Sequence, residues 1–445
     1  MAVNFIILIL FLLLLIYSIS KWNIHPFIAL IITALGLGVS MGLGGENTVN
    51  VLLKGFSETL RWIAIIIILG AFIGEVLQEN GGAFRIADKI VKWAGKKRLP
   101  WAMGLTGYII SIPVFVDVAY ILLQPVIESL SVKSKKPVLF IGFSLIAGLL
   151  VSHTLIPPTP GPMAVASLLN LDIGKMLGVN LIVGVFALVG GVFWVIYIRK
   201  KLWIQYDQKL IESTQLTEEK KSEDQLNAKH NLFYDVLPIL TPIFLIGSGS
   251  FITVEKSNIL FEILNFITLP LVAVFIGAII GVFQINSTDK RSKLNELVEQ
   301  AILKSALVIM ITGAGGSLGY VIKESGIQNE IVHVFSDFPF LGILLPFMVA
   351  AILTTSTGSI TVSLVGSASM IGPMVDSLPL SPEIVAASIG CGSFCVIHAN
   401  SSMFWLLNRL HEVPPKVLYR SITIQSLIMG FSGLIGVLLL KFIGV

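Results

Sequence analysis

The chain has 445 residues, of which 55% are hydrophobic and 13% are charged, and its mean hydropathy is +0.90. A soluble domain carries roughly 25% charged residues, so this composition excludes an ordinary soluble protein. The net charge of +4 gives no reason to expect a nucleic acid partner. The sequence therefore predicts an all-α, polytopic membrane protein that is surrounded by a lipid bilayer.

The N-terminal segments are apolar enough to form transmembrane helices. About 20 apolar residues cross the hydrocarbon core of a bilayer, and residues 3–20 and 24–43 each suffice, joined by a turn at Lys21. Residues 1–19 lack the basic start and the small-residue cleavage site of a signal peptide, so we expect a retained first helix.

The next span is predicted at residues 62–78, with residues 44–61 outside it. Residues 82–98 then combine apolar and basic side chains at helical spacing, which is typical of a helix that lies at the membrane interface.

Residues 101–131 are predicted to form a re-entrant hairpin with its tip at residues 111–117. Basic clusters flank this segment on both sides, at residues 96–98 and 133–136, and cytoplasmic loops carry an excess of Lys and Arg. If both clusters are cytoplasmic, the segment enters and leaves on the same side. The alternative is an ordinary pair of spans, for which about 30 residues are few.

Residues 137–171 are predicted to form a broken helix. The sequence from Ser152 to Pro162 contains four prolines and a glycine, which cannot continue a helix. Broken backbone at membrane depth persists only where it is buried in protein or lines a wet cavity. Paired breaks in the two halves of a chain are typical of a transporter's binding site.

The second half of the chain repeats this order. A hydrophilic segment at residues 199–232 is predicted to be a cytoplasmic linker between a first repeat (1–198) and a second repeat (233–445). The second repeat has a span at 306–322, a hairpin at 338–378 and a broken helix at 382–410 around His398.

An offset of 245 residues aligns the two halves without a gap. It pairs Gly70 with Gly315, Gly74 with Gly319 and His153 with His398. With the linker and the distribution of basic residues, this predicts two inverted repeats and a binding site at the bilayer midplane, where the two breaks lie together. The same distribution places both termini outside the cytoplasm.

The hairpin tips and the breaks are rich in hydroxyl and amide groups. Free backbone N–H groups at the ends of half-helices attract anions, and no Lys or Arg lies nearby in the sequence. We therefore expect a small polyhydroxylated acid as substrate, although the same side chains could merely cap broken helices. The candidate binding residues of this kind are Ser152, Thr154, Thr159, Ser356, Thr357, Gly358, Ser359, Thr361, Asn400, Ser401 and Ser402.

Three ionisable residues fall in these predicted intramembrane segments. Asp117 lies in the first hairpin tip, where an acidic group is costly and is a functional candidate by default, so it is the predicted proton carrier; a carboxylate that caps a half-helix is the alternative. His153 and His398 occupy equivalent positions and are candidate substrate ligands. Two histidines without a further ligand set do not indicate a metal site.

The chain resembles the gluconate permease family of gluconate:proton symporters. The resemblance rests on the segment from Gly74 to Ala83, on residues 112–117 (Ile-Pro-Val-Phe-Val-Asp), on the block from His153 to Val165, and on residues 398–406. One departure is that Asn400 is followed by Ser401, where the family often has Asp, which leaves the substrate and the coupling stoichiometry open.

The resemblance implies a proton-coupled importer of gluconate or a related sugar acid in the bacterial cytoplasmic membrane. It further implies an elevator-type transporter, a homo-oligomer and no cofactor besides the coupled proton. D-serine or another hydroxy acid as substrate, and Na⁺ as the coupling ion, remain open alternatives.

Two other classes of protein fit less well, namely a channel or structural membrane subunit and an intramembrane enzyme. A channel would show selectivity rings or a continuous polar pore face, and no predicted helix has one. An enzyme would need a nucleophile and a base in reach, whereas the neighbours Ser152 and His153 point apart on a helix. The chain lacks an ATP-binding loop of the Gly-x4-Gly-Lys-Ser/Thr type, which excludes primary pumping by this chain.

Overall fold

The computed structural model describes residues 2–22, 24–95, 98–199, 232–249, 259–285, 287, 289–326, 339–399 and 401–444. Throughout these ranges the chain forms helices and no strand. The predicted linker at 199–232 lies almost wholly outside the described residues.

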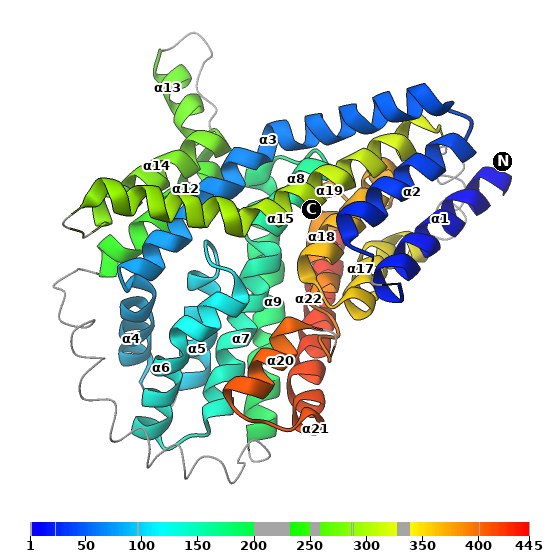
Figure 1. Ribbon diagram of the computed structural model, residues 1–445. Helices are drawn as coiled ribbons and strands as arrows, with labels where there is room; N and C mark the ends of the chain where they lie inside the picture. The colour runs from blue at the N-terminus through cyan, green and yellow to red at the C-terminus, as the bar shows by residue number, and fades with distance from the viewer. Residues whose placement is uncertain are drawn as a thin grey trace.

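Two long helices run antiparallel along the upper part of the molecule (Figure 1). They are α3 (Gly45–Glu79) and α15 (Lys290–Glu324), each of 35 residues. Ser317 of α15 donates a hydrogen bond to the carbonyl oxygen of Leu52 at 2.9 Å, which fixes one end of the crossing. Near the other end, Lys304 contacts the carboxylate of Glu75.

The predicted spans at 62–78 and 306–322 each form the C-terminal part of a longer helix. The polar segments before them, 45–61 and 290–305, are helical as well, because each packs against the other long helix. Thr59 of α3 is buried beside Gly316 of α15, whereas Thr48 is buried beside Gly38 of α2. α3 bends by 41° between Gly45–Arg61 and Ala64–Glu79.

The remaining helices of the upper layer flank this pair. The first two predicted spans correspond to α1 (Ala2–Ser20) and α2 (Pro26–Ser40). α2 packs on α15, and α14 (Pro270–Gln284) packs on α3. α12 (Leu232–Gly249) and α13 (Ile259–Thr268) pack against α14.

The predicted first hairpin corresponds to two helices joined by a short turn. α5 (Leu99–Ile110) has 12 residues and α6 (Val116–Ser134) has 19. α5 is about 18 Å long at 1.5 Å per residue, which is less than the roughly 30 Å core of a bilayer.

Both ends of this hairpin lie near the C-terminal end of α9 (Ile173–Ile198). The ring of Trp101, at the start of α5, is 5.3 Å from that of Phe193. Beyond the end of α6, burial and then the nearby charge of Arg199 lower the pKa of Lys136 below its usual value. The hairpin thus starts and ends at the same side of the bundle.

The second hairpin has the same form. α17 (Pro339–Thr357) and α18 (Ile360–Ile371) meet at Gly358, whose φ of +71° lies in the left-handed region that favours glycine. A short 3₁₀ helix (Gly372–Ser377) follows α18.

Both predicted breaks are present as gaps between helices. The first separates α7 (Val138–Leu155) from α8 (Pro160–Leu168). The second separates α19 (Pro382–Ser393) from α20 (Ser402–Leu410). Every residue of α7 is buried, so the first broken helix forms the centre of the lower layer (Figure 1).

The chain ends with α21 (Pro415–Leu418), a π-helical turn (Tyr419–Thr423) and α22 (Ile424–Ile443), which packs along α9. The element bounds recur at the offset found in the sequence. α3 and α15 begin at 45 and 290 and end at 79 and 324, which is a difference of 245 at both ends.

Candidate functional site

The polar side chains of the first break mostly bond within the break itself. The hydroxyl of Thr154 donates to the carbonyl oxygen of Leu150 at 2.9 Å, and that of Thr159 donates to Ile156. Asn180 of α9 donates to the carbonyl oxygen of Leu155 at 2.7 Å. Thr154 and Thr159 therefore bond to backbone carbonyls of their own segment, and their role as substrate ligands stays a prediction.

Ser152 and His153 differ from these neighbours. Both side chains are buried, and neither the Ser152 hydroxyl nor Nδ1 of His153 has a hydrogen-bond partner within the described part of the chain. The His153 ring lies 5.8 Å from that of Phe115 in the turn of the first hairpin. Buried polar atoms without a partner are rare, so these two could bind a ligand without losing an internal bond.

Glycines allow the other elements to approach the first break closely. A methyl group at Gly70 of α3 would lie 3.1 Å from the carbonyl oxygen of Pro158, and one at Gly390 of α19 would lie 3.1 Å from that of Thr154. One at Gly74 of α3 would collide with the carbonyl oxygen of Pro113 in the first hairpin turn. Segments from both halves of the chain therefore enclose this break.

The second break is tied to the second hairpin. Nε2 of His398 lies 3.0 Å from the carbonyl oxygen of Thr355 in α17. Ser401 is buried and precedes the first residue of α20. Asn400 and the side chain of Ser402 lie outside the described residues, as does the side chain of Ser356.

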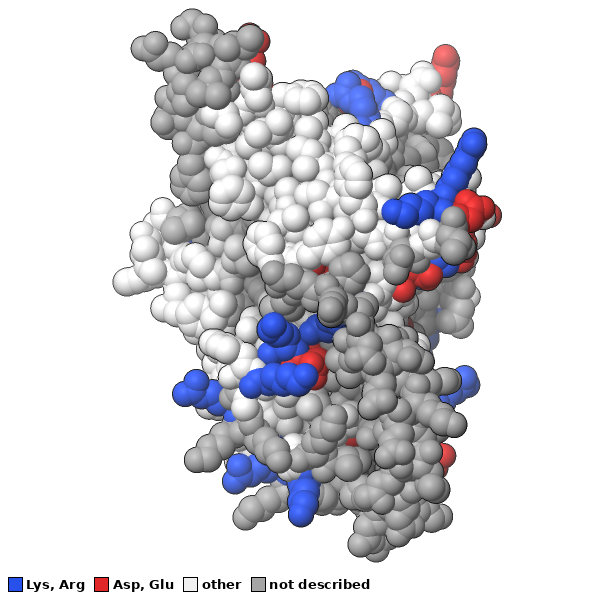
Figure 2. All heavy atoms as spheres, turned by 90° about the vertical axis from the view of Figure 1, so that its left-hand side faces the viewer, with Lys and Arg blue, Asp and Glu red and all other residues white. Residues whose placement is uncertain are grey.

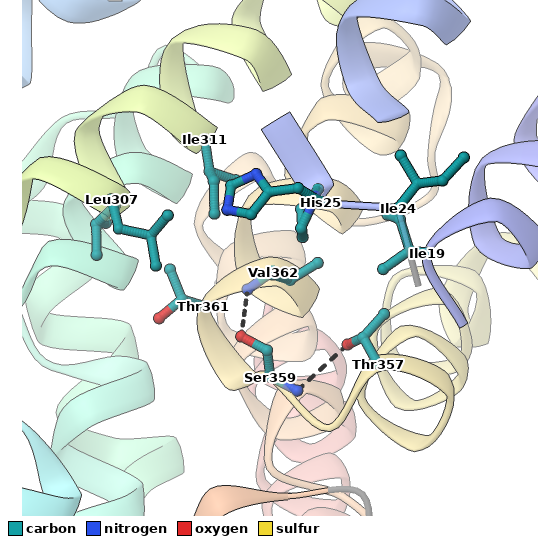
Figure 3. Close-up of a pocket in the computed structure, with 11 residues that line it drawn as sticks. Ile19, Ile24, His25, Leu307, Ile311, Thr357, Ser359, Thr361 and Val362 are labelled. Carbon is teal, nitrogen blue, oxygen red and sulfur yellow. Dashed lines mark hydrogen bonds between the residues drawn. The ribbon is translucent and has the colours of Figure 1, made fainter. Parts of the chain in front are cut away.

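A cavity of about 440 Å³ lies at the tip of the second hairpin (Figure 3). Three of the predicted binding residues line it, namely Thr357, Ser359 and Thr361. Apolar side chains of α15 and of the connection between α1 and α2 form the other walls, and His25 projects over the hairpin residues. The volume falls in the range of roughly 300–1,000 Å³ that is usual for small-molecule sites.

The chemistry of this cavity suits a hydroxylated anion. The Ser359 side chain accepts a hydrogen bond from the N–H of Val362 at 3.3 Å and so caps α18. Thr357 accepts from the N–H of Ser359 at 3.3 Å and donates to the carbonyl oxygen of Leu353 at 2.7 Å. The N-terminus of α18 lies beside these hydroxyls and adds partial positive charge. None of the lining residues is acidic.

The predicted binding residues therefore fall into separate groups. Thr357, Ser359 and Thr361 share the cavity, which none of the first-break residues lines. Asp117 lies in the first turn of α6 and is half-buried. A helix N-terminus stabilises a carboxylate, so its position fits a cap as well as a proton carrier.

Sequence reasoning missed His25, a buried ion pair and a partly buried one. His25 precedes α2, where its Nδ1 accepts a hydrogen bond from the N–H of Phe27 at 3.3 Å.

Arg85 of α4 (Gly82–Ala94) binds both carboxylate oxygens of Asp235 in α12, at 2.8 and 2.6 Å. Lys304 binds Glu75 in the same manner. No local sequence signal pairs residues so far apart.

No cluster of three or more His, Cys, Asp or Glu side chains that could hold a metal ion occurs among the described residues. Within the part of the chain that the structure describes, four helices are long and apolar enough to cross a membrane, or up to six if each of two bent pairs is one span. The chain is a multi-pass membrane protein.

Comparison with known proteins identifies the family. The model of the GntP family permeases matches residues 2–443. A permease of Haemophilus influenzae is 31% identical over 407 residues, which are 89% of this chain and 83% of that protein. The gluconate permease of Pseudomonas aeruginosa is 29% identical over 96% of this chain and 95% of its own length. The D-serine transporter DsdX of Escherichia coli K12 is also 29% identical, over 97% and 96%.

Two solved transporters share the fold. Neisseria gonorrhoeae MtrF matches with a TM-score of 0.65 and 12% identity over 95% of this chain and 96% of its own. Alcanivorax borkumensis YdaH matches with a TM-score of 0.58 and 14% identity over 94% and 98%. The sequence match covers nearly the whole chain and concerns permeases, not enzymes, so this protein belongs to the GntP family of permeases.

Proposed function

We propose that the chain is a secondary active transporter that imports a small hydroxylated monocarboxylate by proton symport, with gluconate or a related sugar acid as substrate. The observation that carries this proposal is the cavity of about 440 Å³ at the second hairpin tip. Its hydroxyls and the N-terminus of α18 match a substrate with several hydroxyl groups and one negative charge.

The relatives support the substrate class and define the alternatives. They include gluconate permeases, an L-idonate transporter and D-serine transporters. A D-serine or other hydroxy-acid permease is the second candidate, because Ser401 stands where the resemblance suggests Asp. Coupling to Na⁺ is the alternative to coupling to protons.

The proposed architecture is two inverted repeats, 1–198 and 233–445, that move as an elevator in the bacterial cytoplasmic membrane. The recurrence of α3 as α15 at an offset of 245 residues supports the repeats. The short α5 and the shared end of both hairpin arms support a re-entrant hairpin. We further propose that the protein is a homo-oligomer and that both termini are extracytoplasmic.

In this mechanism, substrate would bind to the hydroxyls of Thr357, Ser359 and Thr361 as the second hairpin opens. Ser152 and His153 have atoms without internal partners and would bind substrate from the first break. His398, which lies next to the second hairpin, would complete the site together with Asn400, Ser401 and Ser402. Asp117, at the first hairpin tip, would release and take up the coupled proton.

Uptake into proteoliposomes tests the proposal. Purified protein should accumulate radiolabelled gluconate when the outside is made acidic, and a Na⁺ gradient at constant pH should have no effect. Unlabelled sugar acids and D-serine, added in excess, should rank the substrates by competition. Accumulation that follows the Na⁺ gradient alone would identify Na⁺, rather than the proton, as the coupling ion. Competition by D-serine alone would identify D-serine, rather than a sugar acid, as the substrate.

A further inference from the structure

A second cavity, of about 300 Å³, lies between the end of α4 and the start of α5, far from the hairpin-tip residues in sequence. Ile90 and Trp93 of α4 line it, together with Arg98 and with Trp101, Ala102 and Leu105 of α5. It shares no residue with the first cavity. The transport proposal does not use it.

The surroundings of this cavity have the composition of a membrane interface. Trp and Tyr side chains gather where the apolar core of a bilayer meets the headgroups, next to Lys and Arg. Trp93 is 84% exposed, and Phe193 and Tyr197 of the neighbouring α9 are 58% and 76% exposed. Arg199 follows the last residue of that helix, and burial and then the charge of Arg199 lower the pKa of the nearby Lys136.

Figure 2 shows the side of the molecule that carries α4 and α6. Most Lys and Arg side chains on this face lie in its lower half, below a broad uncharged surface. α4 contributes to the basic part, because Lys89 and Lys92 are exposed while Ala83, Ile86 and Ala87 are buried. The exposed Lys89 and Lys92 therefore lie next in sequence to Ile90 and Trp93, which line the cavity.

The lining favours a ligand with an anionic head and an apolar tail. Arg98 is the only charged residue of the six, and its guanidinium is suited to bind two phosphate oxygens at once. Arg98 also precedes the first turn of α5, where no side chain caps the free N–H groups. Ile90 and Leu105 offer apolar contacts, and Leu105 is 38% exposed.

We propose that this cavity binds one anionic phospholipid of the bilayer, with the phosphate on Arg98 and an acyl chain against Ile90 and Leu105. A small soluble anion would bind Arg98 but would leave the exposed Trp93 and Leu105 in water. A phospholipid would cover both, and its anionic headgroup would sit at the level of the exposed Tyr197 and the basic side chains. α4 connects α3 to the first hairpin, so the lipid would stabilise that junction.

Native mass spectrometry of the purified full chain in detergent tests this proposal. The probes are phosphatidylglycerol and phosphatidylcholine with identical acyl chains, added in equal amounts. We expect the protein to retain phosphatidylglycerol in preference, and Arg98→Gln to lower that retention about tenfold, as for one charge-assisted contact. Arg420→Gln, which changes an exposed arginine of the π-helical turn, should retain the lipid like the wild type.

Trp93→Ala provides a second variant, with a thermal unfolding curve for each protein to show that it is folded. It should lower the retention of both lipids, because it removes apolar contact rather than charge. Equal retention by Arg98→Gln and wild type would overturn the proposal, as would equal binding of the two lipids by the wild type. Displacement by millimolar glycerol 1-phosphate would instead identify a soluble-anion site. None of these readouts depends on the transported substrate.

Discussion

Lys304 of α15 places its ammonium nitrogen 2.6 and 2.8 Å from the two carboxylate oxygens of Glu75 in α3. The two helices are the long elements that are related by the offset of 245 residues. At that offset, Glu75 corresponds to Tyr320 and Lys304 corresponds to Thr59, so the ion pair joins only one end of the crossing. The pair therefore distinguishes the two ends of an otherwise similar helix pair.

Removing one member of this pair should destabilise the protein more than replacing both. Lys304→Met would leave the Glu75 carboxylate, which is 10% exposed, without its partner. Breaking such a pair costs about 3–5 kcal/mol when it is fully buried, and less here because Lys304 is 31% exposed. Thermal unfolding in detergent should show a lower midpoint for Lys304→Met than for the double variant Glu75→Gln/Lys304→Met. A single variant as stable as wild type would contradict this.

Thr357→Val should weaken substrate binding at the hairpin cavity. At nearly constant side-chain volume, the variant removes the cavity-lining hydroxyl that accepts a hydrogen bond from the N–H of Ser359. KM for uptake should therefore rise about tenfold, which is the equivalent of one lost hydrogen bond. Thr241→Val is the matched control. Thr241 lies outside the cavity and donates to the carbonyl oxygen of Leu237, four residues earlier, at 2.8 Å, just as Thr357 donates to Leu353. An equal KM for both variants would show that the loss is not specific to the cavity.

His25 should contribute to the same site from the opposite wall. His25→Asn keeps a side-chain acceptor for the N–H of Phe27 but is too short to extend over the cavity. It should raise KM while leaving the unfolding midpoint unchanged, whereas His25→Ala should affect both. If His25→Asn transports with the KM of the wild type, His25 is only a helix cap.

Asp117→Asn should uncouple transport from the proton gradient. It keeps the size and much of the hydrogen bonding of Asp117 but cannot titrate. Uptake against a gradient should be lost, and exchange of labelled for unlabelled substrate should persist. Asp172→Asn is the control, because Asp172 also lies at a helix start, where it accepts from the N–H of Lys175 at 2.9 Å. Near wild-type accumulation by Asp117→Asn would assign the proton to a histidine or to the substrate.

Gly74→Ala should disturb the contact between α3 and the first hairpin. Its methyl group would collide with the carbonyl oxygen of Pro113, which is backbone and cannot rotate away. Uptake should fall sharply while the protein still inserts into the membrane. Gly178→Ala is the control, because nothing lies within 4 Å of the methyl group that it adds to α9. Equal uptake by both variants would mean that α3 and the hairpin turn need not approach this closely.

The sequence by itself determined the place of the first break and of the second hairpin turn. Prolines between Ile156 and Pro162 and the glycine at 358 act on the backbone of their own neighbourhood, so the first break and the second hairpin turn could be located without a structure. The order of elements and the offset of 245 residues were visible for the same reason, because both halves carry local signals at matching positions.

The extents of α3 and α15 could not be predicted in this way. Their polar halves lack the apolar run of a membrane span, and they are helical because each half packs on the other long helix. Hydropathy measures one segment at a time, so it identified only the apolar C-terminal part of each helix.

Which of the predicted binding residues lie together was decided by the tertiary structure alone. The sequence identified hydroxyl groups at the tips and breaks, but not that Thr154 and Thr159 bond within the break while Thr357 and Ser359 line a cavity. His25 lines that cavity from the connection between α1 and α2, and the pairs Glu75–Lys304 and Arg85–Asp235 join residues 229 and 150 positions apart. Whether a polar group is capped, paired or open to a ligand depends on which distant segments pack beside it, and no local pattern specifies that packing.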